Sequence, residues 1–107
     1  MVEFRRFTRA PLEHPLEYSI GTSDARHRGT STDISLGGMF VRTEAPAAFG
    51  AELVIHIRLP GEATETRFPC VVRWTRPDGM GVQFGLLGAR ETHSITEIVA
   101  KAGGARR

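Results

Sequence analysis

The feature that most constrains the fold is a strict alternation of apolar and polar side chains near the middle of the sequence. The apolar members of this stretch are Leu53, Ile55, Ile57 and Leu59. A period of two places alternate side chains on opposite faces of a β-strand, so residues 53–59 are predicted to form a strand with one buried face. His56 falls on the other face, where we expect it to be solvated.

Five further segments have strand patterns and are separated by turn residues. They cover residues 16–20, 26–35, 39–43, 66–75 and 82–86. In the segment 66–75, alternate apolar residues ending at Trp74 are predicted to share one face. Pro69 predicts an edge or a bulge there, because proline cannot donate a backbone hydrogen bond. Six short strands at this spacing predict an all-β protein, and specifically a small barrel.

The C-terminal region has a different pattern, which is typical of a short amphipathic helix. Ser94 and Glu97 have the spacing of a capping box, in which both side chains satisfy free backbone N–H groups. Apolar residues follow at helical spacing, namely Ile95, Ile98, Val99 and Ala102. Gly103 and Gly104 are expected to end this helix, and its start could also lie earlier, near Ala89.

The N-terminal region has charge but little apolar periodicity. Residues 1–11, which end at Pro11, are therefore predicted to form a flexible arm rather than a strand. A chain of 107 residues is long enough for one compact core and too short for two ordinary domains. We accordingly expect an arm over residues 1–11, a barrel with its helix over 12–103, and a basic tail over 104–107.

Three observations bear on the cellular compartment. Cys70 is the only cysteine, and its apolar neighbours predict a buried thiol in a reducing environment. No apolar run approaches the ~20 residues that a transmembrane helix needs. The first residues lack the apolar core of a signal peptide. The sequence thus predicts a cytoplasmic protein that is not inserted in a membrane.

The sequence has no pattern that indicates catalysis. Its four histidines show no metal-ligand spacing with one another or with Cys70. Ser35 does not lie in a nucleophile elbow, and no phosphate-binding glycine loop precedes a lysine. We therefore expect neither an enzyme nor a cofactor.

Arginines are concentrated near the N-terminus, where Arg5, Arg6 and Arg9 fall within five residues. Arginine can fork onto two phosphate oxygens or onto the O6 and N7 atoms of guanine, and it can stack on a base. The alternative is that these residues only make the arm soluble. The net charge of +2 is too small to indicate nucleic acid by itself.

A second polar stretch contains Asp33 and Ser35, which are two residues apart and so share one face of a strand. We expect this face to be exposed beside the flexible backbone of Gly37 and Gly38. The Asp33 carboxylate is an acceptor that complements the N1–H and N2–H₂ donors of guanine. The alternative is a solvated strand end followed by an ordinary glycine turn.

Trp74 lies at the end of its predicted strand and has two possible roles. It could be a platform on which a base stacks at the barrel rim, or it could belong to the core. The core is slightly favoured because Trp74 shares its predicted face with Phe68 and Val72.

Taken in order, two short motifs resemble the two-part signature of PilZ domains, the receptors for cyclic di-GMP. The motifs are Arg5-x-x-x-Arg9 and Asp33-x-Ser35-x-x-Gly38. The resemblance extends from Arg5 to the final helix. It includes the glycine pair before an apolar strand and the segments 71–74 and 79–84.

This resemblance implies a six-stranded antiparallel (split) β-barrel with a short C-terminal α-helix. It also implies that Arg5 and Arg9 hold phosphates and guanine edges of cyclic di-GMP, often as a stacked ligand dimer. The second motif, including Gly38, would form the base-binding surface. Arg6 lies within the first motif and is a further candidate contact, as is Trp74 if it is exposed.

The resemblance therefore predicts a cytoplasmic, non-catalytic effector or adaptor that binds cyclic di-GMP. Ordering of the N-terminal arm would couple the ligand to an unidentified protein partner. One alternative is an adaptor of the same fold that does not bind nucleotide. Another is a small basic barrel that binds nucleic acid, which is disfavoured because the surface strands lack interleaved aromatic residues.

Overall fold

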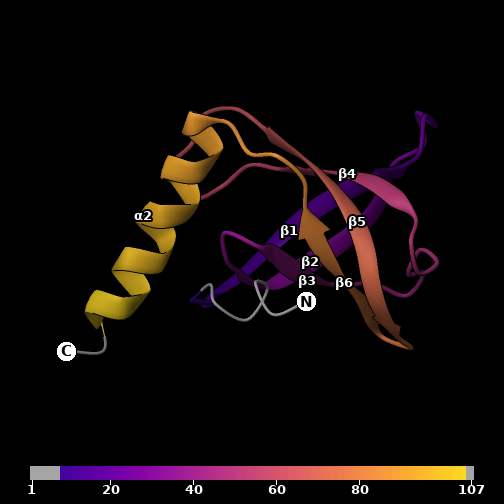
Figure 1. The fold of residues 1–107 in the computed structure, drawn as a ribbon, viewed down its shortest axis with the longest axis horizontal. Helices are drawn as coiled ribbons and strands as arrows, with labels where there is room; N and C mark the ends of the chain where they lie inside the picture. Colours follow the sequence, from indigo (N-terminus) through magenta and orange to yellow (C-terminus); the bar gives the residue numbers. More distant parts are fainter. Residues whose placement is uncertain (1–7, 106–107) are drawn as a thin grey trace.

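The computed structural model describes residues 8–105, with side chains described as far as Lys101. Six strands and one helix follow each other along the chain. They are β1 (Ala10–Ile20), β2 (His27–Ile34), β3 (Gly38–Arg42), β4 (Glu52–Ile57), β5 (Thr66–Arg76), β6 (Gly79–Phe84) and α2 (Ala89–Ala105). Figure 1 shows the strands wrapped into a barrel with α2 beside it.

The six strands form a closed barrel in the order β1-β2-β3-β6-β5-β4, and every neighbouring pair is antiparallel. Closure depends on β1, which pairs with β2 along most of its length and with β4 from Glu17 to Ile20. The prediction of a six-stranded antiparallel barrel with a C-terminal helix is confirmed.

The barrel interior is filled by the alternating apolar residues that the sequence indicated. Leu53, Ile55 and Ile57 of β4 are all buried in the core. The prediction for His56 is wrong, because only 6% of this residue is exposed although it points away from the core. Neighbouring polar side chains cover it, which the period of a single strand cannot reveal.

Strand β5 departs from its predicted pattern after Val72. Its register against β6 shifts between Val72 and Trp74, so Trp74 leaves the core face and is 38% exposed. The preference for a core tryptophan is therefore wrong, and the reason is a β-bulge, which sequence periodicity does not signal. Pro69 instead pairs with Val54 in regular register, inside a closed barrel, so the predicted edge or bulge at this position is also wrong.

Strand β1 begins earlier than its sequence pattern suggested. Ala10 pairs with Ile34 and is fully buried, and Pro11 pairs with Asp33. A register shift between Pro11 and His14 accommodates the proline. Two residues assigned to the arm thus belong to the barrel. Residues 8 and 9 of the predicted arm are described and precede β1, whereas residues 1–7 lie outside the described residues.

Helix α2 begins at Ala89, the earlier of the two starts that the sequence allowed. Ser94 lies inside the helix, where its hydroxyl donates to the carboxylate of Glu62 at 2.8 Å. The predicted capping box is therefore wrong, and Ser94 instead ties the helix to the loop before β5. Ile95 is buried against the barrel core. Gly103 and Gly104 lie within the helix instead of ending it.

Helix α2 is the only helix among residues 8–105, and it is too short and too polar to cross a bilayer.

Candidate functional site

Ser35 organises the tight turn between β2 and β3. Its backbone N–H donates to the Gly38 carbonyl at 2.8 Å. Its hydroxyl oxygen accepts from the N–H groups of Gly37 and Gly38 at 3.1 and 3.3 Å. The residue is fully buried, so the expectation of an exposed hydroxyl is wrong. In this structure Ser35 shapes the turn.

Gly38 is required by close packing of the turn on β6. A Cβ at this position would collide with the backbone carbonyl of Val82, the residue before its partner Gln83. Only glycine allows the two backbones to approach so closely. Ser35 and Gly38 therefore fix the position of the strand end that carries Asp33.

Asp33 faces outward because the register of β2 against β3 shifts between Ser31 and Asp33. Its carboxylate accepts the backbone N–H of Phe40 at 3.2 Å. The Arg9 guanidinium also binds it in a forked pair, from Nε to Oδ2 at 3.2 Å and from Nη2 to Oδ1 at 2.8 Å. About a third of each side chain is exposed. The structure thus brings one residue of each motif into direct contact.

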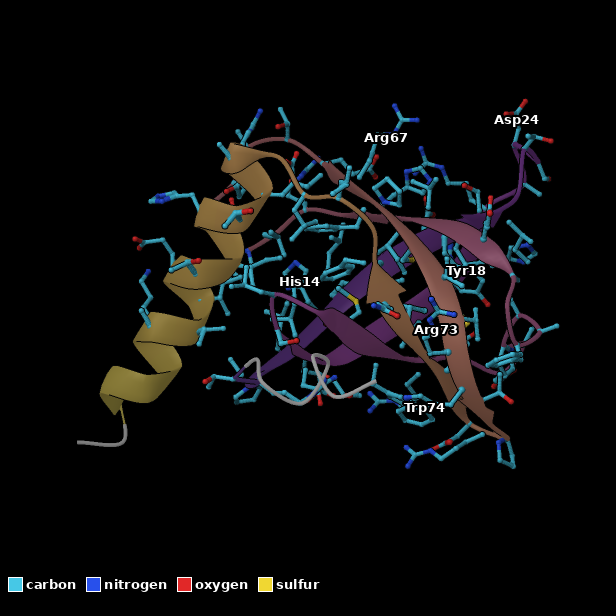
Figure 2. The ribbon with its side chains drawn as sticks, in the orientation of Figure 1. His14, Tyr18, Asp24, Arg67, Arg73 and Trp74 are labelled. Carbon is cyan, nitrogen blue, oxygen red and sulfur yellow. The ribbon has the colours of Figure 1, made fainter. Side chains whose placement is uncertain are left out.

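An aromatic stack lies beside this ion pair on the outer face of the barrel. The rings of Phe40 and Trp74 are stacked with their centroids 5.2 Å apart. The Arg76 guanidinium lies over both rings, 4.5 Å from the centroid of Phe40 and 5.4 Å from that of Trp74. Figure 2 shows Trp74 on the outside of the barrel. Gly81 leaves room for it, because a Cβ there would collide with the indole.

We call this region the Asp33–Trp74 surface. It consists of Arg9, Asp33, Phe40, Trp74 and Arg76. Sequence reasoning missed Phe40 and Arg76. Phe40 could have been found, because it alternates along β3 with the core residues Met39 and Val41. Only 6% of Phe40 is exposed, because Trp74 and Arg76 pack against its ring.

A hollow of about 830 Å³ lies next to the hairpin of β5 and β6. Its lining includes Arg28, Arg42 and Asp78. Asp78 pairs with Arg76 of the aromatic stack at 3.4 Å, and Arg42 pairs with Glu13 at 3.1 Å. Guanidinium groups thus line this hollow as well as covering the aromatic stack.

Two candidate residues, Arg5 and Arg6, lie outside the described residues. Within the described part of the chain, no group of three or more His, Cys, Asp or Glu residues could hold a metal ion. Cys70 is buried, and burial raises the pKa of its thiol to about 12, so the reactive thiolate is not formed near neutral pH.

The geometry suits a flat, polar heterocycle that carries an anion. Stacking on an aromatic side chain contributes about 1–3 kcal/mol per base. The Asp33 carboxylate can accept two N–H groups at a base edge, and the arginines can bind phosphate oxygens. These three elements lie next to one another on the Asp33–Trp74 surface.

Residues 3–101 match the model of the PilZ domain family. Among curated protein sequences, none is significantly similar to this chain.

Several solved structures share the fold. The PilZ domain of CeSA from a cellulose-synthesizing bacterium has a TM-score of 0.69 and 20% identity, over 94% of this chain and 99% of that one. The PilZ domain of YcgR from Escherichia coli, solved with c-di-GMP, has a TM-score of 0.73 and 14% identity, over 96% and 94%. The motility inhibitor MotI/DgrA of Bacillus subtilis has a TM-score of 0.74 and 21% identity, and this chain covers 53% of it.

We predict that Ser35→Ala lowers the free energy of unfolding by about 1–3 kcal/mol, because two N–H groups beside a buried hydroxyl lose their acceptor. Urea denaturation would measure this change. Ser23→Ala is the matched control, since the Ser23 hydroxyl also accepts a backbone N–H two residues on, but in an exposed loop. The control should change stability by less than about 0.5 kcal/mol. A Ser35→Ala protein as stable as the wild type would contradict the role assigned to the turn.

Proposed function

Because the chain belongs to the PilZ domain family, we propose that it binds cyclic di-GMP on the Asp33–Trp74 surface. PilZ domains are non-catalytic receptors for this nucleotide, so the expectation that the chain is not an enzyme is confirmed by its family. The observation that carries the proposal is the outward Asp33 carboxylate beside the Phe40–Trp74 stack, in which Trp74 is exposed. Guanine offers both matching features, a flat ring and an edge with two N–H donors.

Binding requires an exchange of partners at Asp33. Both oxygens of its carboxylate are held by Arg9 in the free protein. We propose that the guanine edge takes the place of Arg9 and that Arg9 moves to a phosphate. A partly exposed ion pair contributes only about 0.2–1 kcal/mol, so its loss is easily offset by a charge-assisted bond to phosphate.

The remaining residues of the two motifs have distinct roles in this proposal. Arg5 and Arg6 are additional phosphate or base contacts from the segment before β1. Ser35 and Gly38 act through the turn that places Asp33, as their burial and close packing indicate. Trp74 is the stacking platform.

We propose that the protein is a cytoplasmic effector that passes the signal to a protein partner. Residues 4–9 would close over the bound nucleotide and create a new surface for that partner. The alternative is an adaptor of the same fold that does not bind nucleotide. The direct Arg9–Asp33 pair favours this alternative, because it satisfies the carboxylate without a ligand.

Calorimetric titration separates the two functions. We expect the wild type to bind cyclic di-GMP, with weaker or no binding of cyclic di-AMP, GMP and GTP. Quenching of Trp74, the only tryptophan, provides a second readout. Absence of cyclic di-GMP binding would reject the receptor and leave the adaptor.

Asp33→Asn should selectively reduce guanine recognition. The amide keeps an oxygen for the N–H of Phe40 but cannot accept both guanine donors, and an unpaired donor costs about 1–3 kcal/mol. We therefore expect the preference for cyclic di-GMP over cyclic di-AMP to fall about tenfold or more. An equal loss of affinity for both ligands would mean that Asp33 is only structural.

Arg9→Ala should weaken binding about tenfold or more, since a charge-assisted contact is worth about 1.5–3 kcal/mol. Arg9→Lys should restore little of it, because an ammonium group cannot fork onto two acceptors. Arg58→Ala is the control, as this exposed arginine follows β4, across the barrel from β3. An Arg9→Lys variant that binds like the wild type would argue against the forked contact.

Hydrogen exchange tests the coupling step. Backbone amides of residues 4–9 should gain protection when cyclic di-GMP is added, whereas those of residues 53–57 in β4 should change little. Full protection of residues 4–9 without nucleotide would disprove the ordering step, while calorimetry would still report on binding.

A further inference from the structure

A second polar cluster lies on the opposite side of the barrel. Its centre is His56 in β4, and β4 is three strands away from β3 in both directions around the barrel. Figure 2 shows the nearby side chains of Arg67 and Asp24 at the edge of the molecule opposite Trp74. This cluster is therefore separate from the Asp33–Trp74 surface.

His56 is buried in an unusual way. Its Nε2 lies 3.1 Å from the hydroxyl of Ser19 in the neighbouring strand β1. Its Nδ1 is buried and has no hydrogen-bond partner among the described residues. A buried polar atom without a partner is costly, so it is explained by strain, by a functional role or by an ordered water molecule.

Three charged side chains near His56 form what we call the Arg26 clasp, made of Glu17, Arg26 and Glu65. Arg26 follows the β1–β2 turn, and its Nη1 binds Glu17 at 3.0 Å and Glu65 at 3.3 Å. Glu17 is the residue of β1 directly opposite His56. The clasp therefore ties the end of this turn to β1 and to the residue that precedes β5.

Two hollows lie next to the clasp, and His56 and Glu65 line both. One of about 510 Å³ is bounded by the turn and also by Asp24, Arg26, Glu65 and Arg67. The other, of about 350 Å³, also contacts His14, Glu17, Arg58 and Glu65. A side chain that moved out of the clasp would thus have space to enter.

The neutral form of His56 is the one that fits this environment. Burial lowers the pKa of the imidazole, and the positive charges of Arg26 and Arg67 lower it further. Glu65 and Glu17 act in the opposite direction, but both are held by Arg26. A protonated Nδ1 would need an acceptor, and these two carboxylates are the acidic groups that act on His56 electrostatically.

Two arrangements therefore compete for the same carboxylates. With His56 neutral, Arg26 holds both. With His56 protonated, the imidazolium repels Arg26 and attracts a glutamate. We propose that His56 and the Arg26 clasp form a proton-sensitive latch, in which protonation of Nδ1 draws Glu17 or Glu65 away from Arg26 and releases the segment 21–26 from the barrel.

Hydrogen exchange and NMR test the latch together. When the pH is lowered from about 7.5 to about 5, free carboxylates stay ionised. Over this change, wild-type amides of residues 21–26 should come to exchange about tenfold faster, after correction for intrinsic rates. His56→Gln, which keeps a polar group for Ser19 but cannot be protonated, should remove this response. His93→Gln changes an exposed histidine of α2 and should retain it. A wild type that shows no response, or a His56→Gln protein that keeps it, would overturn the proposal.

Arg26→Gln is an independent variant that leaves the buried histidine intact. Removing the cation frees both glutamates, so the pKa of His56 measured by imidazole NMR should rise above its wild-type value. The segment 21–26 should exchange fast at both pH values. An unchanged imidazole pKa in this variant would overturn the competition for carboxylates.

The pH dependence of stability has a defined sign. The folded protein binds a proton at His56 less readily than the unfolded chain, because the folded-state pKa is lowered. The latch's contribution is therefore complete above about pH 6.5, the ordinary value for imidazole, and is lost as the pH falls below it. His56→Gln should flatten this part of the thermal-stability profile.

Discussion

The double pairing of β1 is the interaction on which the other features depend. This strand closes the barrel by bonding to β2 on one side and to β4 on the other. Its first residue, Ala10, pairs with Ile34, the neighbour of Asp33. This pairing brings Arg9 onto the Asp33 carboxylate. Its other end brings Ser19 and Glu17 against His56. One strand thus supplies a partner to each of two polar clusters on opposite sides of the barrel.

Local breaks in strand pairing produce the candidate binding surface. A regular strand would direct Asp33 to the same face as the buried Ser31, and Trp74 to the same face as the buried Val72. A register shift before each residue turns its side chain outward instead. β-Bulges are frequent next to functional sites because they redirect a side chain without disturbing the rest of the sheet. The acceptor and the aromatic platform are exposed by the same device.

In the proposed function, the motif residues divide into those that bind the ligand and those that position the binding residues. Asp33 and Arg9 present charged atoms to solvent, whereas Ser35 and Gly38 are consumed by the turn and by its packing on β6. The two sequence motifs contain all four of these residues, but a motif does not distinguish the two roles. It could not assign the buried role of Ser35, since burial depends on strands that are remote in the sequence.

The sequence by itself determined the six strands, the barrel, the C-terminal helix and the two motifs, because side-chain period and turn chemistry are local properties. Tertiary structure alone decided that Trp74 is exposed, that His56 is buried and that Arg9 contacts Asp33. Each of these depends on the register between strands, which is set by the sum of many packing contacts around the closed barrel. A register shift of one residue moves a side chain to the opposite face of the sheet. The side-chain period of an isolated strand does not predict where such a shift occurs.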